Sequence, residues 1–241
     1  MAGRLIAIGD IHGCAAELEA LLGGLRPEAG DTLVCVGDYI DRGADSRGVI
    51  DMVMELANRP GLATVFLRGN HEDMCLSYLG RGGHYGEAWM VNGGAATMRS
   101  YGLDARAAGE EAALGFPQKH LQFLDRLPLS HRTDGFLVVH AGIRPDLPWE
   151  EQQEEDLLWI REDFILAPHS LPDTIVFGHT PRRTVFVDLP YKIGIDTGCV
   201  YGHHLTGYII ESGEFINVPA NDVYDPPSGR FTGELGVFGQ D

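Results

Sequence analysis

Side chains that can bind metal ions stand beside glycine at the ends of five short apolar runs of the sequence. The motifs are GDIHG at 9–13, GDYIDRG at 37–43, GNHE at 69–72, HAG at 140–142 and GHT at 178–180. Their ligand-capable residues are Asp10, His12, Asp38, Asn70, His140 and His179. Oxygen and imidazole donors without sulfur suit manganese, iron or zinc. The pattern therefore predicts a catalytic metal centre.

This donor set is larger than the three or four protein ligands that one catalytic ion requires. Two ions that share a carboxylate account for it, and Asp38 is the best candidate for the bridge. A single Gly-Asp or Gly-His turn is commonplace and by itself indicates no function. Five strand ends that each bring a ligand-capable residue beside glycine are a far more specific signal.

The apolar runs before the first three motifs predict parallel strands of an α/β fold. Residues 5–8, 32–36 and 64–67 are of β type, and helical patterns at 18–25 and 49–56 separate them. A βαβαβ order implies right-handed crossovers between parallel strands. Because ligands bind at the carboxyl ends of strands in open α/β sheets, we expect the motifs to converge on one crevice.

The rest of the chain predicts an insertion, a second group of strands and a tail. Residues 72–128 have a helical, glycine-rich pattern that is typical of a helical insertion over one end of the sheet. Strand patterns return at 136–139, 174–177, 184–187, 193–195, 205–210 and 214–218. We expect them to form a mostly antiparallel sheet, followed by an extended tail at 219–241. No linker is recognisable, so residues 1–241 are expected to form a single domain.

Charge and composition restrict the partners. The chain has 18 Lys and Arg against 35 Asp and Glu, a formal net charge of −17, so a nucleic-acid polymer is not expected to bind. The four scattered cysteines form no CxxC pair and indicate reduced thiols. The apolar run near the amino terminus is too short for a signal peptide or a membrane span. We therefore expect a cytoplasmic monomer that does not contact membranes.

The motif series GDxHG, GDxxDRG, GNHE, HAG and GH, in this order, resembles the phosphoprotein phosphatase family of the metallophosphoesterases. That family includes phage lambda phosphatase and the eukaryotic serine/threonine phosphatases, and the resemblance covers about residues 5–199. It implies a four-layer α/β sandwich of two mixed β-sheets flanked by helices, with a dimetal site at the strand carboxyl ends. It also implies two divalent ions, with Mn²⁺ favoured and iron or zinc as alternatives.

By position, the resemblance implies one ion bound by Asp10, His12 and Asp38 and another bound by Asp38, Asn70, His140 and His179. His71 then corresponds to the general acid, and Asp41 to the carboxylate that orients its imidazole. Arg42 and Arg161 correspond to two arginines that bind phosphate oxygens. The implied reaction is hydrolysis of a phosphate monoester by direct attack of a metal-bridging hydroxide, without a covalent phosphoenzyme.

Three functions remain open at the level of sequence. A serine/threonine protein phosphatase is favoured, because residues 67–72 and 158–161 look more like protein phosphatases. A symmetrical bis(5'-nucleosyl)-tetraphosphatase would use the same site on diadenosine tetraphosphate. A non-catalytic metal- or phosphate-binding scaffold would normally lack the acid or one arginine, and neither is missing. The expected partner is therefore a phosphoprotein, a small phosphate ester or a dinucleotide.

Several other polar residues fit structural roles better. Four histidines have no partner at ligand spacing, namely His84, His120, His131 and His169. His203 and His204 are adjacent on an extended segment and face opposite ways, so at most one lines the cleft. Asp196 is expected to shape a turn near the site. The Asn-Gly-Gly loop at 92–94 is only weak evidence for a phosphate-binding loop. Trp89 is expected to be a packing residue, with a stacking platform for a nucleobase as the alternative.

Overall fold

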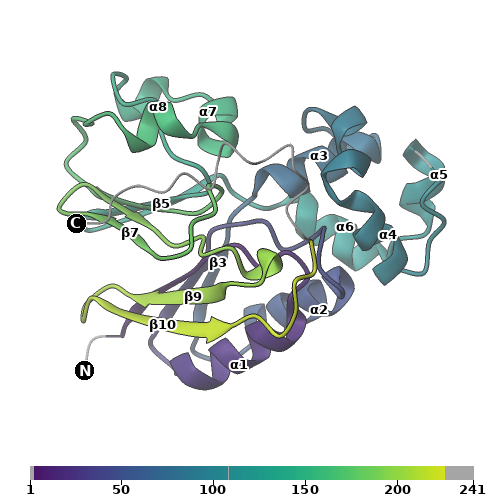
Figure 1. Cartoon of the computed structure of the whole chain (residues 1–241), viewed down its shortest axis with the longest axis horizontal. Helices are drawn as coiled ribbons and strands as arrows, with labels where there is room; N and C mark the ends of the chain where they lie inside the picture. Colours follow the sequence, from purple (N-terminus) through teal and green to yellow (C-terminus); the bar gives the residue numbers. More distant parts are fainter. Residues whose placement is uncertain (1–2, 108, 226–241) are drawn as a thin grey trace.

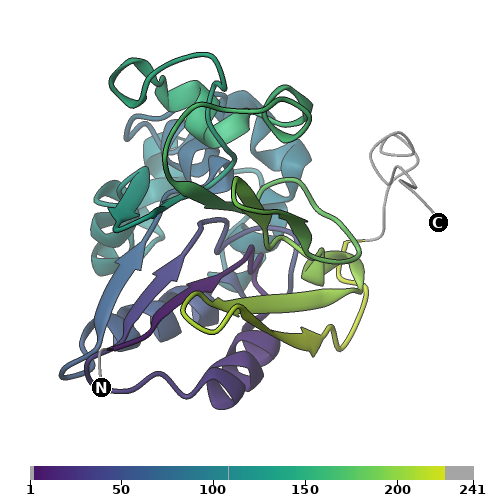
Figure 2. The same cartoon turned by 90° about the vertical axis from the view of Figure 1, so that its left-hand side faces the viewer.

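The computed structural model describes residues 3–107 and 109–225. Within these ranges, two five-stranded sheets stack face to face and helices cover their outer faces (Figure 1). The turned view shows the two sheets one above the other (Figure 2). This arrangement confirms the expected α/β sandwich of two mixed sheets flanked by helices.

The first sheet contains the three parallel strands that the sequence predicts. Its order is β10-β9-β1-β2-β3. Its strands are β1 (Leu5–Ile8), β2 (Thr32–Cys35), β3 (Ala63–Phe66), β9 (His204–Ile209) and β10 (Glu214–Pro219). β1, β2 and β3 are parallel, whereas β9 is antiparallel to both β1 and β10. The last two strands of the described chain therefore return to the sheet that the first strands began.

The second sheet has the order β4-β5-β6-β8-β7. Its strands are β4 (Ser130–Thr133), β5 (Phe136–Val139), β6 (Thr174–Phe177), β7 (Phe186–Asp188) and β8 (Lys192–Gly194). β5, β6 and β8 are parallel, so the prediction of a mostly antiparallel second sheet is wrong. Parallel strands need a long crossover connection, and the segment between β5 and β6 is long enough to provide one. β7 lies at the edge of the sheet and pairs antiparallel with β8, so β8 runs parallel to β6.

Helices lie on both outer faces of the sandwich. α1 (Ala15–Leu25) and α2 (Ser46–Ala57) cover the first sheet, and α7 (Glu154–Trp159) and α8 (Glu162–Ile165) cover the second. The sequence of α2 shows why a helix forms there. Asp45 accepts the Gly48 N–H at 2.8 Å as N-cap, and Val49, Ile50 and Val53 repeat at helical spacing and are buried.

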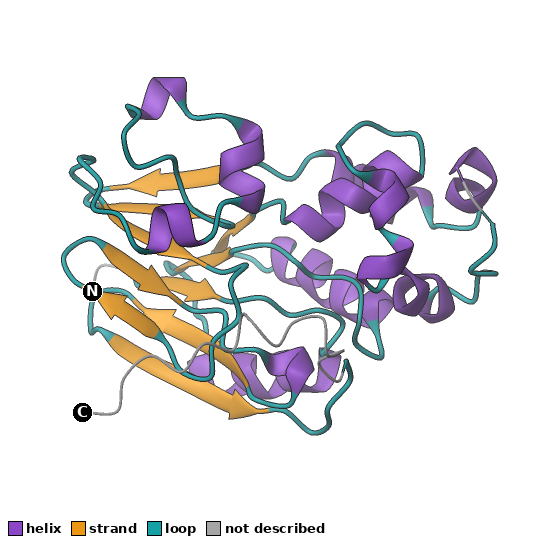
Figure 3. Cartoon of the chain, turned by 45° about the horizontal axis from the view of Figure 1, so that its top comes forward, coloured by secondary structure: helices purple, strands orange, loops and turns teal. Residues whose placement is uncertain are grey.

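The segment between β3 and β4 forms the predicted helical insertion. It contains α3 (Asn70–Tyr78), α4 (Gly94–Ser100), α5 (Gly109–Leu114) and α6 (Gln118–Asp125), with 3₁₀ turns at Gly86–Ala88 and Met90–Asn92. Figure 3 shows these helices gathered beyond one end of the strands. Two further 3₁₀ turns occupy Trp149–Glu151 and Cys199–Tyr201. Of the expected tail, Pro219 closes β10, residues 220–225 follow it, and 226–241 lie outside the described residues.

Three apolar layers hold the sandwich together. On β1, Leu5 and Ala7 pack between the sheets, while Ile6 and Ile8 pack under the helices. The strand is therefore apolar along its whole length, since both of its faces are covered. All four cysteines are buried and free. In the part of the chain that the structure describes, no helix is both long and apolar enough to cross a bilayer.

Candidate active site

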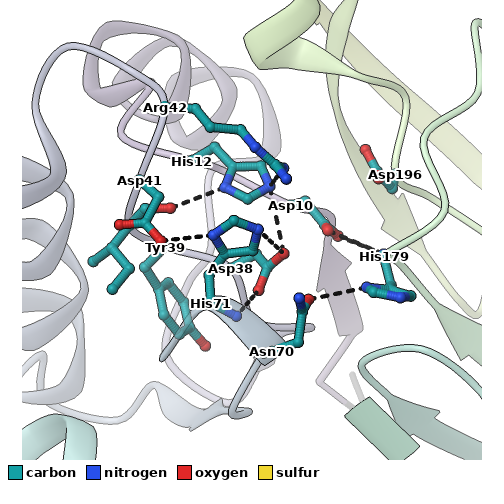
Figure 4. Close-up of polar contacts among 12 residues, drawn as sticks. Asp10, His12, Asp38, Tyr39, Asp41, Arg42, Asn70, His71, His179 and Asp196 are labelled. Atoms are coloured by element: carbon teal, nitrogen blue, oxygen red, sulfur yellow. Dashed lines mark hydrogen bonds and ion pairs between the residues drawn. The ribbon is translucent and has the colours of Figure 1, made fainter. Parts of the chain in front are cut away.

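The predicted ligand residues converge at the carboxyl ends of β1, β2, β3, β5 and β6. Asp38 lies among them, with its Oδ2 3.4 Å from His12 Nε2 and its Oδ1 3.5 Å from His140 Nε2 (Figure 4). Asn70 Oδ1 is 2.9 Å from His140 Nε2 and 3.0 Å from His179 Nδ1. Segments more than a hundred residues apart in the sequence thus meet at one buried cluster.

Asp10 joins the first motif to the last. Its Oδ2 accepts the backbone N–H of His179 at 3.0 Å, and the side chain is 4% exposed. A Cβ at residue 178 would lie 1.9 Å from Asp10 Oδ1, so only glycine leaves space for this carboxylate. The same holds between the second and third motifs, where a Cβ at Gly37, whose φ is +116°, would lie 2.6 Å from the Gly69 nitrogen.

The backbone is strained where the strands release their side chains. Within the described ranges, seven non-glycine residues have positive φ, and five of them are His12, Asp38, Asp41, Arg42 and His179. Residues with a Cβ rarely adopt this conformation, and such outliers cluster at functional sites. The left-handed turn lets the chain reverse direction directly after a strand while its side chain points into the cluster.

Backbone carbonyls orient two of the histidines. His12 Nδ1 donates to the Ile40 carbonyl at 2.9 Å, and His140 Nδ1 donates to the Val36 carbonyl at 3.1 Å. With the proton on Nδ1, each ring presents the Nε2 lone pair to Asp38. A carbonyl that fixes the tautomer in this way is the usual arrangement behind a metal-binding histidine.

Burial sets the charge state of the cluster. It raises the pKa of Asp38 to about 7 and that of Asp196 to about 6, and it raises the pKa of Asp10, to which the neighbouring Asp196 and Asp38 charges also contribute. Burial lowers the pKa of His12 well below its ordinary value and that of His140 to about 3, so both imidazoles are neutral. Crowded carboxylates beside neutral imidazoles form a site that divalent cations would stabilise.

The geometry of the donors fits two ions. The ligand atoms of His12, Asp38 and His71 lie within 4.8 Å of one another, and so do those of Asp38, His140 and His179. Asp38 belongs to both groups. We do not count His71 as a ligand, although it lies close enough to belong to the first group. Its Nδ1 is hydrogen-bonded to Asp41, and its Nε2 is 4.0 Å from Asp38 Oδ2.

His71 and Asp41 form the predicted pair. His71 Nδ1 donates to Asp41 Oδ2 at 2.6 Å, and both side chains are buried. The His71 Nε2 atom therefore faces the centre of the cluster (Figure 4). A histidine held in this way can give a proton to a group that leaves from a substrate in the cluster.

Both predicted arginines lie at the cluster. Arg42 Nη1 is 2.8 Å from His12 Nε2, and the Arg42 guanidinium lies 5.6 Å from the centre of the Tyr201 ring. Burial lowers the pKa of His179, and the positive charge of Arg161 adds to this effect, so Arg161 is near enough to act on the cluster electrostatically. Two cationic forks thus border the group of proposed ligands.

Glu72 is a site residue that the sequence analysis did not single out. Its carboxylate accepts the backbone N–H groups of Asp38 and Tyr39 at 2.8 Å each and that of Gly69 at 2.9 Å. It thereby joins the loop after β2 to the start of α3. The available signal was its place at the third position of a helix that begins at Asn70, where a glutamate commonly turns back to the preceding backbone.

The less specific candidates have other contacts. Trp89 is fully buried and presents no ring face to a nucleobase. Gly93 of the 92–94 loop accepts the Arg42 N–H at 3.3 Å, so this loop supports Arg42. His84 pairs with Asp73 at 3.1 Å, and the ligand atoms of these two residues and Glu154 lie within 4.8 Å of one another, so His84 does have partners at ligand distance.

The remaining histidines and Asp196 complete the comparison with the sequence. His120 binds the Tyr101 hydroxyl at 2.8 Å, His169 the Tyr191 carbonyl at 3.1 Å, and His131 lies in β4. His204 opens β9, and His203 lies beside Gly198. Asp196 accepts the Gly198 N–H at 3.0 Å, which is the expected turn.

Comparisons with family models, with characterised proteins and with solved structures all match phosphoesterases. The calcineurin-like phosphoesterase model matches residues 3–207. Serine/threonine-protein phosphatase 1 of Salmonella typhimurium is 36% identical over 208 residues, which cover 83% of this chain and 88% of that protein. The asymmetrical bis(5'-nucleosyl)-tetraphosphatase PrpE of Oceanobacillus iheyensis is 29% identical over 253 residues, with coverages of 92% and 94%. The crystal structure of a candidate diadenosine tetraphosphatase has 28% identity and a TM-score of 0.67, and the match covers 91% of this chain and 95% of that one.

Replacing Glu72 should loosen the whole site. Both carboxyl oxygens of Glu72 accept buried N–H groups, and Glu72→Gln replaces one of them by an NH₂ group that cannot accept, so we expect the free energy of unfolding to fall by about 2 kcal/mol or more. Urea unfolding followed by circular dichroism measures it. The exposed Glu87→Gln should leave the midpoint unchanged, and an equally unchanged midpoint for Glu72→Gln would show that the Glu72 carboxyl group does not hold these backbone segments together.

Replacing Asp38 should reduce metal binding. Asp38→Asn weakens a ligand that faces both groups of donors, so bound metal should fall from about two ions per chain to about one or fewer. Elemental analysis after dialysis against Mn²⁺ measures the ratio. Asp45→Asn, which keeps a capping residue on an exposed helix start, is the matched control. Undiminished metal in Asp38→Asn would refute the bridge.

Proposed function

The chain belongs to the calcineurin-like phosphoesterase family, whose members are metal-dependent hydrolases, and we propose that it removes phosphate from phosphoserine and phosphothreonine in proteins. The observation that carries this proposal is the buried His71–Asp41 pair, which turns a proton donor toward the candidate metal ligands. An alkyl phosphate needs such a donor because its alkoxide leaves poorly. The relative that is 36% identical, a serine/threonine-protein phosphatase, supports the same choice.

In this proposal, Asp10, His12 and Asp38 hold one divalent ion, and Asp38, Asn70, His140 and His179 hold the other. The donor set suits Mn²⁺, with iron or zinc as alternatives. When bound, two such ions activate a water for in-line attack on phosphorus by lowering its pKa from 15.7 toward about 7.

The protein's own residues bind and orient the phosphate group. The planar guanidinium groups of Arg42 and Arg161 can each hold two phosphate oxygens and offset the charge that develops on them. Arg42 donates to His12 Nε2 in this structure. Because that nitrogen is proposed to bind an ion, the Arg42 donor becomes available to the substrate.

His71 completes the reaction by protonating the departing oxygen. Its Nδ1–H is held by Asp41 at 2.6 Å, which fixes the orientation of the ring, while burial and the neighbouring Arg42 charge lower the pKa of the imidazole. The proton leaves from Nε2, on the side of the ring that faces Asp38. The neighbouring ligand Asn70 reaches the same cluster from the preceding position of the chain.

A second candidate is the asymmetrical hydrolysis of a bis(5'-nucleosyl)-tetraphosphate. Several relatives that are 28–29% identical carry this name, and the structure with a TM-score of 0.67 is described as a candidate diadenosine tetraphosphatase. The sequence alone suggested the symmetrical reaction, and the names of these relatives redirect this alternative to the asymmetrical one. A net charge of −17 disfavours a tetraphosphate, which is why we place this candidate second. A non-catalytic scaffold is disfavoured because every proposed catalytic role is filled.

Removal of the acid should depend on the leaving group. We expect His71→Ala to lower kcat on a phosphoserine peptide by about 10² or more, and to lower it much less on p-nitrophenyl phosphate, whose phenolate needs little protonation. Steady-state phosphate release measures both. Bound Mn²⁺ should be unchanged, and the exposed His84→Ala serves as a control. Equal losses on the two substrates would argue against His71 as the acid.

Direct comparison of substrates separates the two candidates. With Mn²⁺, kcat/KM on a phosphoserine peptide should exceed that on diadenosine tetraphosphate by about tenfold or more. Chromatography of the nucleotide products identifies the cleavage, since asymmetrical hydrolysis gives AMP and ATP. Asp10→Ala should abolish both activities and thus exclude a contaminating enzyme. The opposite preference would make the tetraphosphatase the function of this chain.

A further inference from the structure

The Asp41 carboxylate is held from more than one side. Among the described residues, three side chains donate to it, and two of these, Trp89 and Thr97, come from the part of the helical insertion that follows α3. Trp89 Nε1 lies 3.0 Å from Oδ1 and 2.9 Å from Oδ2, and Thr97 Oγ1 lies 2.6 Å from Oδ1. The third donor is His71, on Oδ2 at 2.6 Å. The insertion therefore reaches the carboxylate that orients the proposed acid.

We propose that Trp89 and Thr97 are positioning residues that aim the His71 imidazole by fixing the Asp41 carboxylate. This inference rests on the proposed role of His71 as the general acid. An indole N–H can only donate, so Trp89 cannot exchange roles with the carboxylate. Because it spans both carboxylate oxygens, it fixes the rotation of this group, and the remaining lone pair of Oδ2 points to His71 Nδ1.

Thr97 also fixes the backbone of Asp41. The Asp41 N–H donates to Thr97 Oγ1 at 2.9 Å and to Ser46 Oγ at 3.0 Å, while the Thr97 hydroxyl donates to the side chain of the same aspartate. Asp41 has a φ of +75°, an unfavourable conformation for an aspartate that its surroundings must hold. One threonine thus restrains both the backbone and the carboxylate.

Trp89 is itself held rigidly. It is fully buried, and its ring centre lies 4.9 Å from that of Tyr78. A Cβ at Gly94 would lie 2.7 Å from the indole ring, and the Gly94 N–H donates to the Trp89 carbonyl at 3.0 Å. The ring cannot swing away from Asp41 without moving the start of α4. The packing of Trp89 inside the insertion therefore fixes the Asp41 carboxylate, which in turn orients the imidazole of His71.

The first test removes the indole N–H of Trp89 and keeps an aromatic ring at this buried position. Trp89→Phe retains a buried aromatic ring without the N–H, so we expect kcat on a phosphoserine peptide to fall about tenfold and kcat on p-nitrophenyl phosphate to change less than about twofold. KM and bound Mn²⁺ should be unchanged. Tyr101→Phe is the matched control, since it removes the hydroxyl that binds His120 from another buried aromatic residue of the insertion.

Thr97 gives an independent measurement should Trp89→Phe fold poorly. Thr97→Val removes the hydroxyl with little change in shape and should show the same dependence on the leaving group as Trp89→Phe. Thr97→Ser keeps the hydroxyl and should restore the activity on the phosphopeptide. A valine variant as active as the serine variant would overturn the role of Thr97.

A double-mutant cycle separates this inference from the proposal on which it rests. If Trp89 acts through His71, then Trp89→Phe should cause no further loss in a His71→Ala background. A further loss there, or equal losses on the two substrates in Trp89→Phe alone, would overturn the positioning role. If His71→Ala itself shows no dependence on the leaving group, the proposed acid fails first, and that result is visible without any Trp89 variant.

Discussion

A reciprocal pair of hydrogen bonds between the loop after β2 and the start of α3, here called the clasp, supports the whole candidate site. Glu72 accepts the N–H of Asp38 at 2.8 Å, and Asp38 Oδ1 accepts the N–H of His71 at 3.1 Å. The side chain of each segment thus accepts a backbone N–H of the other. The clasp links the proposed bridging ligand to the proposed acid, and the first loop also carries Asp41 and Arg42. Loss of either carboxylate would remove hydrogen bonds that hold the loop after β2 and the start of α3 together.

The clasp explains how a strained backbone persists at the site. Each residue held at positive φ costs on the order of 1–3 kcal/mol, and five such residues surround the cluster. Their turns follow strands whose faces are both buried in apolar layers, so the strand ends cannot shift to relieve the strain. Rigid strand ends and hydrogen-bonded loops together hold the side chains before any ligand arrives, which is the preorganisation that catalysis requires.

The sequence predicts those parts of the structure that depend on short segments. Motifs at strand ends identify the candidate cluster because the chemistry and the preceding apolar run are neighbours in the sequence. The pairing of strands that are far apart in the sequence is harder to predict. The pattern at 136–139 does not show that its partner at 174–177 is parallel, and β4 reads SHRT, without an apolar alternation. Trp89 and Asp41 are 48 residues apart, and no local pattern signals their bond.

The architecture around His71 bears on the choice between substrates. The departing group of a dinucleoside tetraphosphate is a phosphate chain that leaves without much protonation, whereas a serine alkoxide needs a proton in the transition state. A chain that acted only on polyphosphates would gain little from orienting an acid through Asp41 and restraining that carboxylate from the insertion. Under the proposed function, the buried contacts of Trp89 and Thr97 to Asp41 support a substrate with a poor leaving group. The same ligand cluster serves the chemistry proposed for both reactions, so under the proposed function the two candidates differ in how strongly they depend on the acid and on the residues that orient it.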